Sequence, residues 1–279
     1  MSIIKSVVTL SLCLLMTGVV GAAITSSGGT EDFEAISYKD EEEIVDPTTM
    51  TGWEIQTDPG AFANGGIFCD TSNGGGTLDT ASFTVASGAG SKPVSNVDLK
   101  VTQPTAPTVR GQCLEGPAVS GRTVTYEFWF AVTSVPESTY VMIGGVSFDA
   151  LNNDPKISFW IQSVTKDIRM HVHSDVSAVG LMVKQDVGSG IDDDTDYTLS
   201  EWQKAEFEVV TSTSGEGSVV FKLNGVQVGD AVAIRQDSGG DLLTHHFYSL
   251  ARKSSNTAYY LDDVKVTLDT GVDDWFIMY

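Results

Sequence analysis

Short stretches rich in Val, Ile, Phe, Tyr and Thr recur along the chain, and clusters of Gly, Asn, Asp, Ser and Pro separate them. Apolar stretches of this length, bounded by turn residues, are typical of β-strands. No segment shows a helical period over more than about two turns. We expect strands at residues 66–70, 80–85, 97–102, 123–132, 140–148, 156–163, 168–173, 179–184, 204–211, 218–223, 226–229, 244–251 and 258–267.

The sharpest turn signal is Asn224-Gly225, which lies between Val219–Leu223 and Val226–Val228. An Asn-Gly pair between two apolar stretches predicts a β-hairpin with a two-residue loop. Many short strands with frequent turns in one domain favour a two-sheet arrangement over an open sheet. The sequence therefore predicts an all-β fold, an antiparallel β-sandwich that spans residues 32–268.

Two consecutive acids, Asp262 and Asp263, interrupt the apolar strand Tyr259–Val266. Successive side chains of a strand point to opposite faces, so one carboxylate is expected to face inward or toward a rim. A carboxylate in that position needs a cation or hydrogen-bond donors. The other end of the chain carries a similar group of acids in Thr30–Glu34, followed by Thr51-Gly52-Trp53.

These two ends together resemble the secreted jelly-roll sandwiches of carbohydrate-binding modules. The stretch Trp202–Val209, which leads toward the predicted hairpin, resembles concanavalin A-like lectins and laminin-G-like domains. Both resemblances imply a jelly-roll β-sandwich, and together they cover most of residues 32–267. They also imply a lectin-like protein that binds a polysaccharide or another glycan.

The resemblance to carbohydrate-binding modules further implies a structural calcium ion that ties the first strand to the last. The matching positions are Glu34 and Asp262. Calcium is a hard cation that prefers oxygen ligands, and two carboxylates brought together would repel each other without a cation. The alternative is that Glu34 and Asp262 pair with a Lys, an Arg or backbone N–H groups.

A strand at Asp167–His173 alternates apolar residues with cationic and imidazole side chains. If this strand lies next to 156–163, one sheet face combines an aromatic ring with polar donors, as sugar sites require. An exposed polar face without a ligand and a catalytic or metal site remain the alternatives. The candidate sugar-binding residues are Trp160, Gln162, Arg169, His171, His173 and Trp129.

Catalysis has less support from the sequence. The chain lacks the Arg-rich motif and the Tyr-Lys-Gly strand of jelly-roll polysaccharide lyases, and the E-x-D-x-x-E motif of jelly-roll glucanases. We therefore expect non-catalytic glycan binding. A structural or adhesion protein that self-associates is the first alternative, and a divergent polysaccharide lyase or glycoside hydrolase is the second.

Residues 1–22 combine Lys5 with a short apolar stretch and small residues at Val20-Gly21-Ala22, a pattern typical of a secretory signal peptide. A disordered leader is expected at 23–31 and an acidic, aromatic tail at 269–279. No later segment is long and apolar enough for a membrane span. The protein is therefore expected to be secreted, extracellular or at the cell surface.

Removing the signal peptide leaves two cysteines, Cys69 and Cys113, and an even pair in an exported chain predicts a disulfide. Two buried thiols are the alternative. The formal net charge is −21, which repels phosphate backbones and therefore argues against a nucleic-acid partner.

Overall fold

The computed structural model describes residues 24–34, 42–44, 52–57, 66–70, 83–93, 97–102, 110–132, 140–147, 157–162, 168–174, 181–185, 200–210, 216–235, 242–251 and 258–269. Every regular element within these residues is a β-strand. None of the described residues forms a helix that could cross a membrane. The predicted signal peptide and most of the predicted tail lie outside the described residues.

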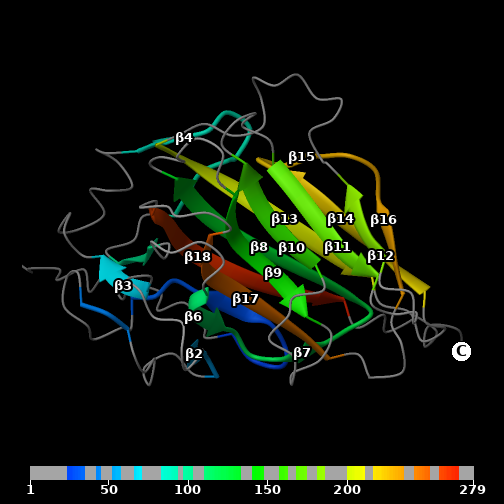
Figure 1. The fold of residues 1–279 in the computed structure, drawn as a ribbon, viewed down its shortest axis with the longest axis horizontal. Coiled ribbons are helices and arrows are strands. Elements are labelled where there is room, and N and C mark those ends of the chain that lie inside the picture. The colour runs from blue at the N-terminus through cyan, green and yellow to red at the C-terminus, as the bar shows by residue number, and fades with distance from the viewer. Residues whose placement is uncertain are drawn as a thin grey trace, which may run out of the picture.

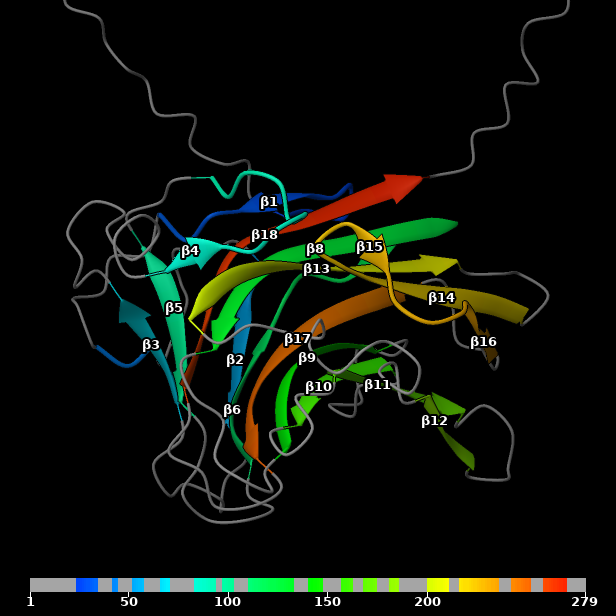
Figure 2. The same ribbon diagram turned by 90° about the horizontal axis from the view of Figure 1, so that it is seen from above.

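The described strands form two sheets, which Figure 2 shows as two facing layers. The first is a 10-stranded sheet. In order across the sheet, its main strands are β15 (Val226–Gln227), β14 (Glu216–Leu223), β13 (Glu201–Val210), β8 (Thr123–Val132), β18 (Ala258–Asp269), β5 (Asp98–Thr102) and β3 (Gly66–Asp70). Beside this path, β1 (Gly29–Glu31) pairs with β18, β16 (Val232–Arg235) with β14, and β4 (Thr84–Val85) with β13.

The second sheet has eight strands (Figure 1). In order across the sheet, its main strands are β12 (Leu181–Gln185), β11 (Ile168–Ser174), β10 (Ile157–Gln162), β9 (Tyr140–Ser147), β17 (Leu242–Ala251), β6 (Arg110–Glu115) and β2 (Glu54–Thr57). Beside this path, β7 (Val119–Ser120) pairs with β17. All pairings in this sheet are antiparallel. The predicted all-β, two-sheet sandwich is confirmed.

The core lies between the two sheets and is rich in aromatic rings. Phe128 and Phe207 from the 10-stranded sheet meet Phe159 and Phe247 from the 8-stranded sheet, with ring centroids 5.1 to 6.3 Å apart. These rings are buried. Strand β13 alternates buried and half-buried positions along most of its length, as a strand with one face on a core must. The hydrophobic pattern of the sequence therefore fixes which face of each sheet turns inward.

The predicted Asn224-Gly225 hairpin is confirmed. Leu223 pairs with Val226 across the turn, and both central residues have positive φ, 52° for Asn224 and 80° for Gly225. Two positive φ angles are the geometry of a type I′ turn, which matches the twist of the flanking strands.

The N-terminal segment differs from the expectation of a disordered leader at 23–31. Strand β1 pairs with β18 there, aligning Thr30 with Lys265, and Ile24 is buried in the core. Ile24 contributes apolar burial and β1 adds backbone hydrogen bonds, so the sandwich begins before residue 32.

Candidate functional site

The backbone register of the 8-stranded sheet aligns one residue from each of its seven main strands. We call this line the polar row, because six of its seven members have polar side chains and the seventh is a glycine. From one edge to the other it consists of Glu54, Glu115, His246, Gly145, Ser158, His171 and Lys184.

The rows on either side of the polar row belong to the core. One contains Leu114, Phe247 and Phe159, and the other contains Val146 and Ile157; all five are buried against the opposite sheet. Successive side chains of a strand point to opposite faces. The described members of the polar row therefore lie on the face of the sheet turned away from the core.

Three side chains on β17 and β6 form a group in which His246 contacts both Glu115 and Cys113. His246 Nδ1 lies 3.9 Å from Glu115 Oε2 and 3.7 Å from Cys113 Sγ. Both His246 and Cys113 are buried, and the Glu115 side chain is 12% exposed. Burial lowers the pKa of His246 to about 4. The imidazole is therefore neutral near pH 7, where it can donate one hydrogen bond and accept another.

Cys113 forms no disulfide in the structure, so the predicted Cys69–Cys113 bridge is absent. The reason lies in the alternation of β6. Leu114 points into the core, so its neighbour Cys113 points to the outer face, where it contacts His246. Cys69 belongs to β3 of the other sheet. The alternative stated from the sequence, a buried thiol, describes Cys113.

The condition stated from the sequence, that these two strands are neighbours, is met, since the register of β10 and β11 pairs Trp160 with Arg169 and Ser158 with His171. Gln162 pairs with Tyr140, and His173 with Met182. The side chains of Gln162, Arg169, His171 and His173 lie outside the described part, so their sugar contacts stay predictions. The Trp160 side chain is described, and with 7% of its surface exposed it is largely buried.

Trp129 does not share the face of Trp160. It lies on β8 of the other sheet, in a small apolar cluster with Phe83, Ala131 and Trp202. The prediction that placed it with Trp160 is wrong, because strand alternation does not tell which of two sheets a strand joins.

The acidic pair Asp262-Asp263 lies at a β-bulge, where three residues of β18 oppose two of β8. Asp263 has a φ of 46°, in the left-handed region. Leu261 and Val264, on either side of the pair, are both buried in the core. Because the bulge adds one residue between them, the side chains of Asp262 and Asp263 both point to the face of the sheet opposite the core. Asp262 is completely buried and pairs with a cation, as expected from the sequence, whereas the bulge places the second carboxylate on the same side instead of the opposite face.

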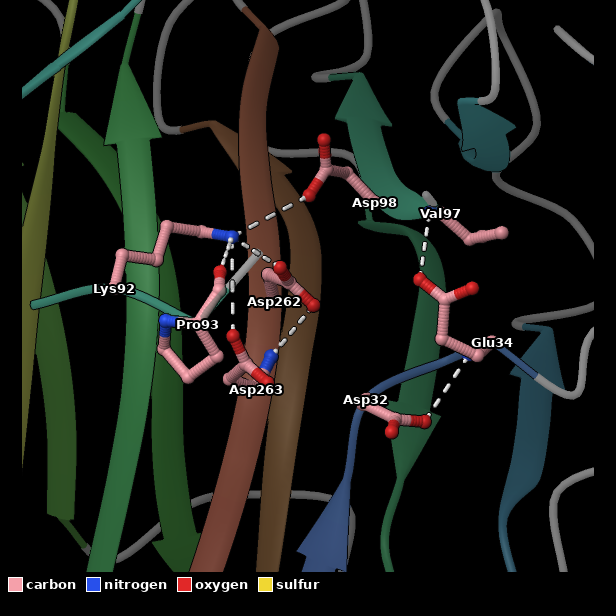
Figure 3. Close-up of polar contacts among 8 residues, drawn as sticks. All are labelled: Asp32, Glu34, Lys92, Pro93, Val97, Asp98, Asp262 and Asp263. Carbon is pink, nitrogen blue, oxygen red and sulfur yellow. Dashed lines mark hydrogen bonds and ion pairs between the residues drawn. The ribbon is translucent and has the colours of Figure 1, made fainter. Parts of the chain in front are cut away.

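Both carboxylates meet Lys92, as Figure 3 shows. The ammonium donates a hydrogen bond to Asp262 Oδ2 and another, of 3.2 Å, to the carbonyl oxygen of Pro93. It also lies 3.8 Å from Asp263 Oδ2 and 4.0 Å from Asp98 Oδ1. The Lys92 side chain is 2% exposed. A buried ammonium thus has three carboxylates around it.

Glu34, the other predicted calcium ligand, has a separate partner. Its Oε1 accepts a hydrogen bond of 3.2 Å from the backbone N–H of Val97 (Figure 3). These contacts match the alternative stated from the sequence: Glu34 pairs with a backbone N–H group, and Asp262 pairs with a lysine. Among the described residues, no group of three His, Cys, Asp or Glu side chains is placed to hold a metal ion.

Sequence reasoning missed Lys92, Glu115 and His246. No motif links Lys92 to Asp262, which lies 170 residues later. Strand β6, which carries Glu115, was not expected at all. Strand alternation in His245-His246-Phe247-Tyr248 puts His246 and Tyr248 on one side and Phe247 on the other, and this is the signal in the sequence that could have identified His246.

No family model matches the chain, and no curated protein matches it. Among solved structures, "Cellulose induced protein, Cip1" aligns with a TM-score of 0.50 and 16% identity, covering 86% of this chain and 97% of that one. An endo-β-1,4-glucuronan lyase from the fungus Trichoderma reesei aligns with a TM-score of 0.46 and 14% identity, covering 78% and 95%. Alginate lyase Aly36B aligns with a TM-score of 0.46 and 14% identity, covering 69% and 96%. The likeness to Cip1 supports the fold.

Proposed function

We propose that this protein is exported and binds a polysaccharide on the outer face of the 8-stranded sheet, along the polar row. The observation that carries the proposal is the row itself. Six polar residues from six strands, with Gly145 of β9 among them, are aligned between two apolar rows of the core.

An extended glycan presents hydroxyl groups at regular intervals, and a row of donors and acceptors on a rigid sheet suits it. The charges along the row differ between its ends. Glu54 and Glu115 lie on β2 and β6, whereas His171 and Lys184 lie on β11 and β12. The acidic end suits sugar hydroxyls as donors, and the basic end suits hydroxyls or a uronate carboxylate.

Trp160 has a different part in this proposal from the one expected from the sequence. Because its ring is 93% covered, it offers little surface for stacking on a sugar and instead supports the sheet beside Arg169. His246 is 2% exposed and Glu115, taken as a whole residue, 9%, so the direct contacts in this proposal come from Glu54, which is exposed, and from the members of the row on β10, β11 and β12.

The test is a glycan array that contains neutral and uronate-containing oligosaccharides, followed by titration of each glycan that binds. Lys184→Gln and His171→Gln should each weaken binding about tenfold, the loss expected for about 1.4 kcal/mol of contact. Lys265→Gln is the control, since Lys265 is exposed on the 10-stranded sheet. An array without binding, from protein with a β-rich circular dichroism spectrum, would favour the assembly role instead.

One observation favours catalysis as a second candidate. The buried imidazole of His246 is neutral near pH 7 and lies against the carboxylate of Glu115. Polysaccharide cleavage by β-elimination requires a base that accepts a proton from the substrate. With a pKa of about 4 and 2% exposure, His246 could take this role only if substrate binding uncovered the ring and raised its pKa. The same polysaccharides should therefore be incubated with the protein and followed by ultraviolet absorbance of unsaturated chain ends. Product that His246→Gln abolishes would establish an enzyme, and stable substrate would leave binding alone.

A further inference from the structure

The resemblance of the chain ends to carbohydrate-binding modules implies a calcium ion at Glu34 and Asp262, and the structure provides a test of that expectation. Asp262 is completely buried and hydrogen-bonds the ammonium of Lys92. Glu34 hydrogen-bonds a backbone N–H group. The carboxylates that would bind calcium are thus already paired with donors, and the residues present do not fit the ion.

We propose that Lys92 supplies, as part of the chain, the positive charge that a calcium ion would supply at this corner of the sandwich. The protein is then independent of calcium. This inference does not rest on the proposed glycan binding, because the Lys92 cluster involves the 10-stranded sheet and the segment 83–93.

The surroundings of Lys92 satisfy the ammonium as a bound cation would be satisfied. Three carboxylates, from Asp98, Asp262 and Asp263, and the Pro93 carbonyl oxygen provide oxygen atoms around Nζ. The aromatic face of Trp202 lies on another side, with its ring centroid 4.5 Å from Nζ. Oxygen atoms and one aromatic face together replace the water that the buried ammonium has lost.

The same contacts explain how two distant segments are joined. Lys92 ends the stretch 83–92, whose Phe83, Ala86 and Ala89 cover Trp129 and Trp202. Its ammonium fixes this stretch to the bulge of β18 and to the start of β5. A divalent ion would also neutralise the carboxylates. Unlike the Lys92 side chain, however, it would not be covalently attached to the stretch 83–92 and so would not hold that stretch to β18 and β5. Lysine performs both tasks.

The test compares melting temperatures of the wild type, Lys92→Met and Lys92→Ala in chelator and in millimolar calcium chloride. The wild-type protein should melt at the same temperature in both. Lys92→Met should melt about 10 °C lower, as expected when one partner of a buried ion pair is removed from a domain of this size. Calcium should not restore this variant, because the methionine side chain fills the space of the lysine.

Lys92→Ala keeps the carboxylates and opens that space, so millimolar calcium should recover part of its lost melting temperature. Terbium gives a local readout, because an ion in place of the ammonium would lie close to Trp202, and tryptophan excitation would then sensitise its luminescence. We expect more sensitised emission from Lys92→Ala than from the wild type or Lys92→Met. A wild-type melting temperature that rises with calcium overturns the proposal, and so does a Lys92→Met protein as stable as the wild type.

Discussion

Acidification should destabilise this protein through two adjacent histidines of β17. His245 faces the core, where its ring lies 4.9 Å from the Trp53 ring and 5.3 Å from the Tyr126 ring, measured between centroids. His246 faces the outer side. Burial is the main cause that lowers the pKa of His245 to about 3 and of His246 to about 4.

The sign follows from proton binding in the two states. An unfolded histidine has a pKa of about 6.5, so below that pH the unfolded chain binds protons that the folded protein excludes. The stabilising contribution of each neutral histidine is complete above about pH 6.5 and is lost as the pH falls toward the folded pKa. Each histidine then contributes a slope of about 1.4 kcal/mol per pH unit to the free energy of unfolding between about pH 5 and pH 6.

Glu31 opposes this slope. Its carboxyl is buried, and desolvation raises its pKa, so the folded state holds that proton to a higher pH than the unfolded chain does. The titration of one carboxyl can offset at most the slope contributed by one histidine. The slope of the wild-type unfolding free energy therefore lies between about 1.4 and 2.7 kcal/mol per pH unit. The comparison between variants is sharper, because Glu31 contributes to each of them.

The assay is urea denaturation of the wild type and His245→Phe at several pH values between about pH 5 and pH 7. Replacing His245 should reduce the slope by about 1.4 kcal/mol per pH unit, whatever it does to stability at pH 7. His246→Gln should give a similar reduction. Parallel curves of unfolding free energy against pH for the wild type and both variants would refute the claim that these imidazoles are buried in the neutral form.

Three further substitutions test local geometry, each by urea denaturation at pH 7. Gly116→Ala should cost about 2–4 kcal/mol, because the added Cβ would lie 2.1 Å from His245 Cε1 and the ring has no room to move; a loss below 1 kcal/mol would show that the ring can shift. Gly225→Val should cost about 1–2 kcal/mol, since φ is 80° there, and an unchanged midpoint would contradict the type I′ turn. Glu127→Gln removes a carboxylate that two lysines contact at 2.6 and 2.9 Å, and should cost about 1 kcal/mol at low salt and less in concentrated salt; a loss that does not depend on salt would speak against an ionic origin.

The sequence predicted the strands with regular alternation well. The prediction for 123–132 coincides with β8, and that for 258–267 lies within β18. Short or irregular strands were missed, among them β2 and β6. Strand β6 reads Arg-Gly-Gln-Cys-Leu-Glu, and one buried leucine gives too little periodicity to distinguish it from a loop.

The acidic pair shows why the local conformation of a site is harder to predict than a fold. The sequence identified Asp262-Asp263 as exceptional and required a partner for it. Two features determine the partner. The first is a bulge with a positive φ at Asp263, and the second is the position of Lys92, which is distant in sequence but contacts this bulge in the fold. Neither leaves a periodic signal, because a bulge interrupts the alternation from which side-chain direction is deduced.

The polar row, by contrast, follows from the packing of the core. A shift of β17 by one residue would move Phe247 out of the core and turn His246 and its contact with Glu115 inward. The aromatic contacts of Phe247 with Phe128 and Trp53 oppose that shift. The interactions that hold the two sheets together thereby fix the register that aligns one residue from each of seven strands, six of them polar. Substitutions of Phe247 should therefore impair the proposed glycan binding as well as stability, although its side chain faces away from the polar row.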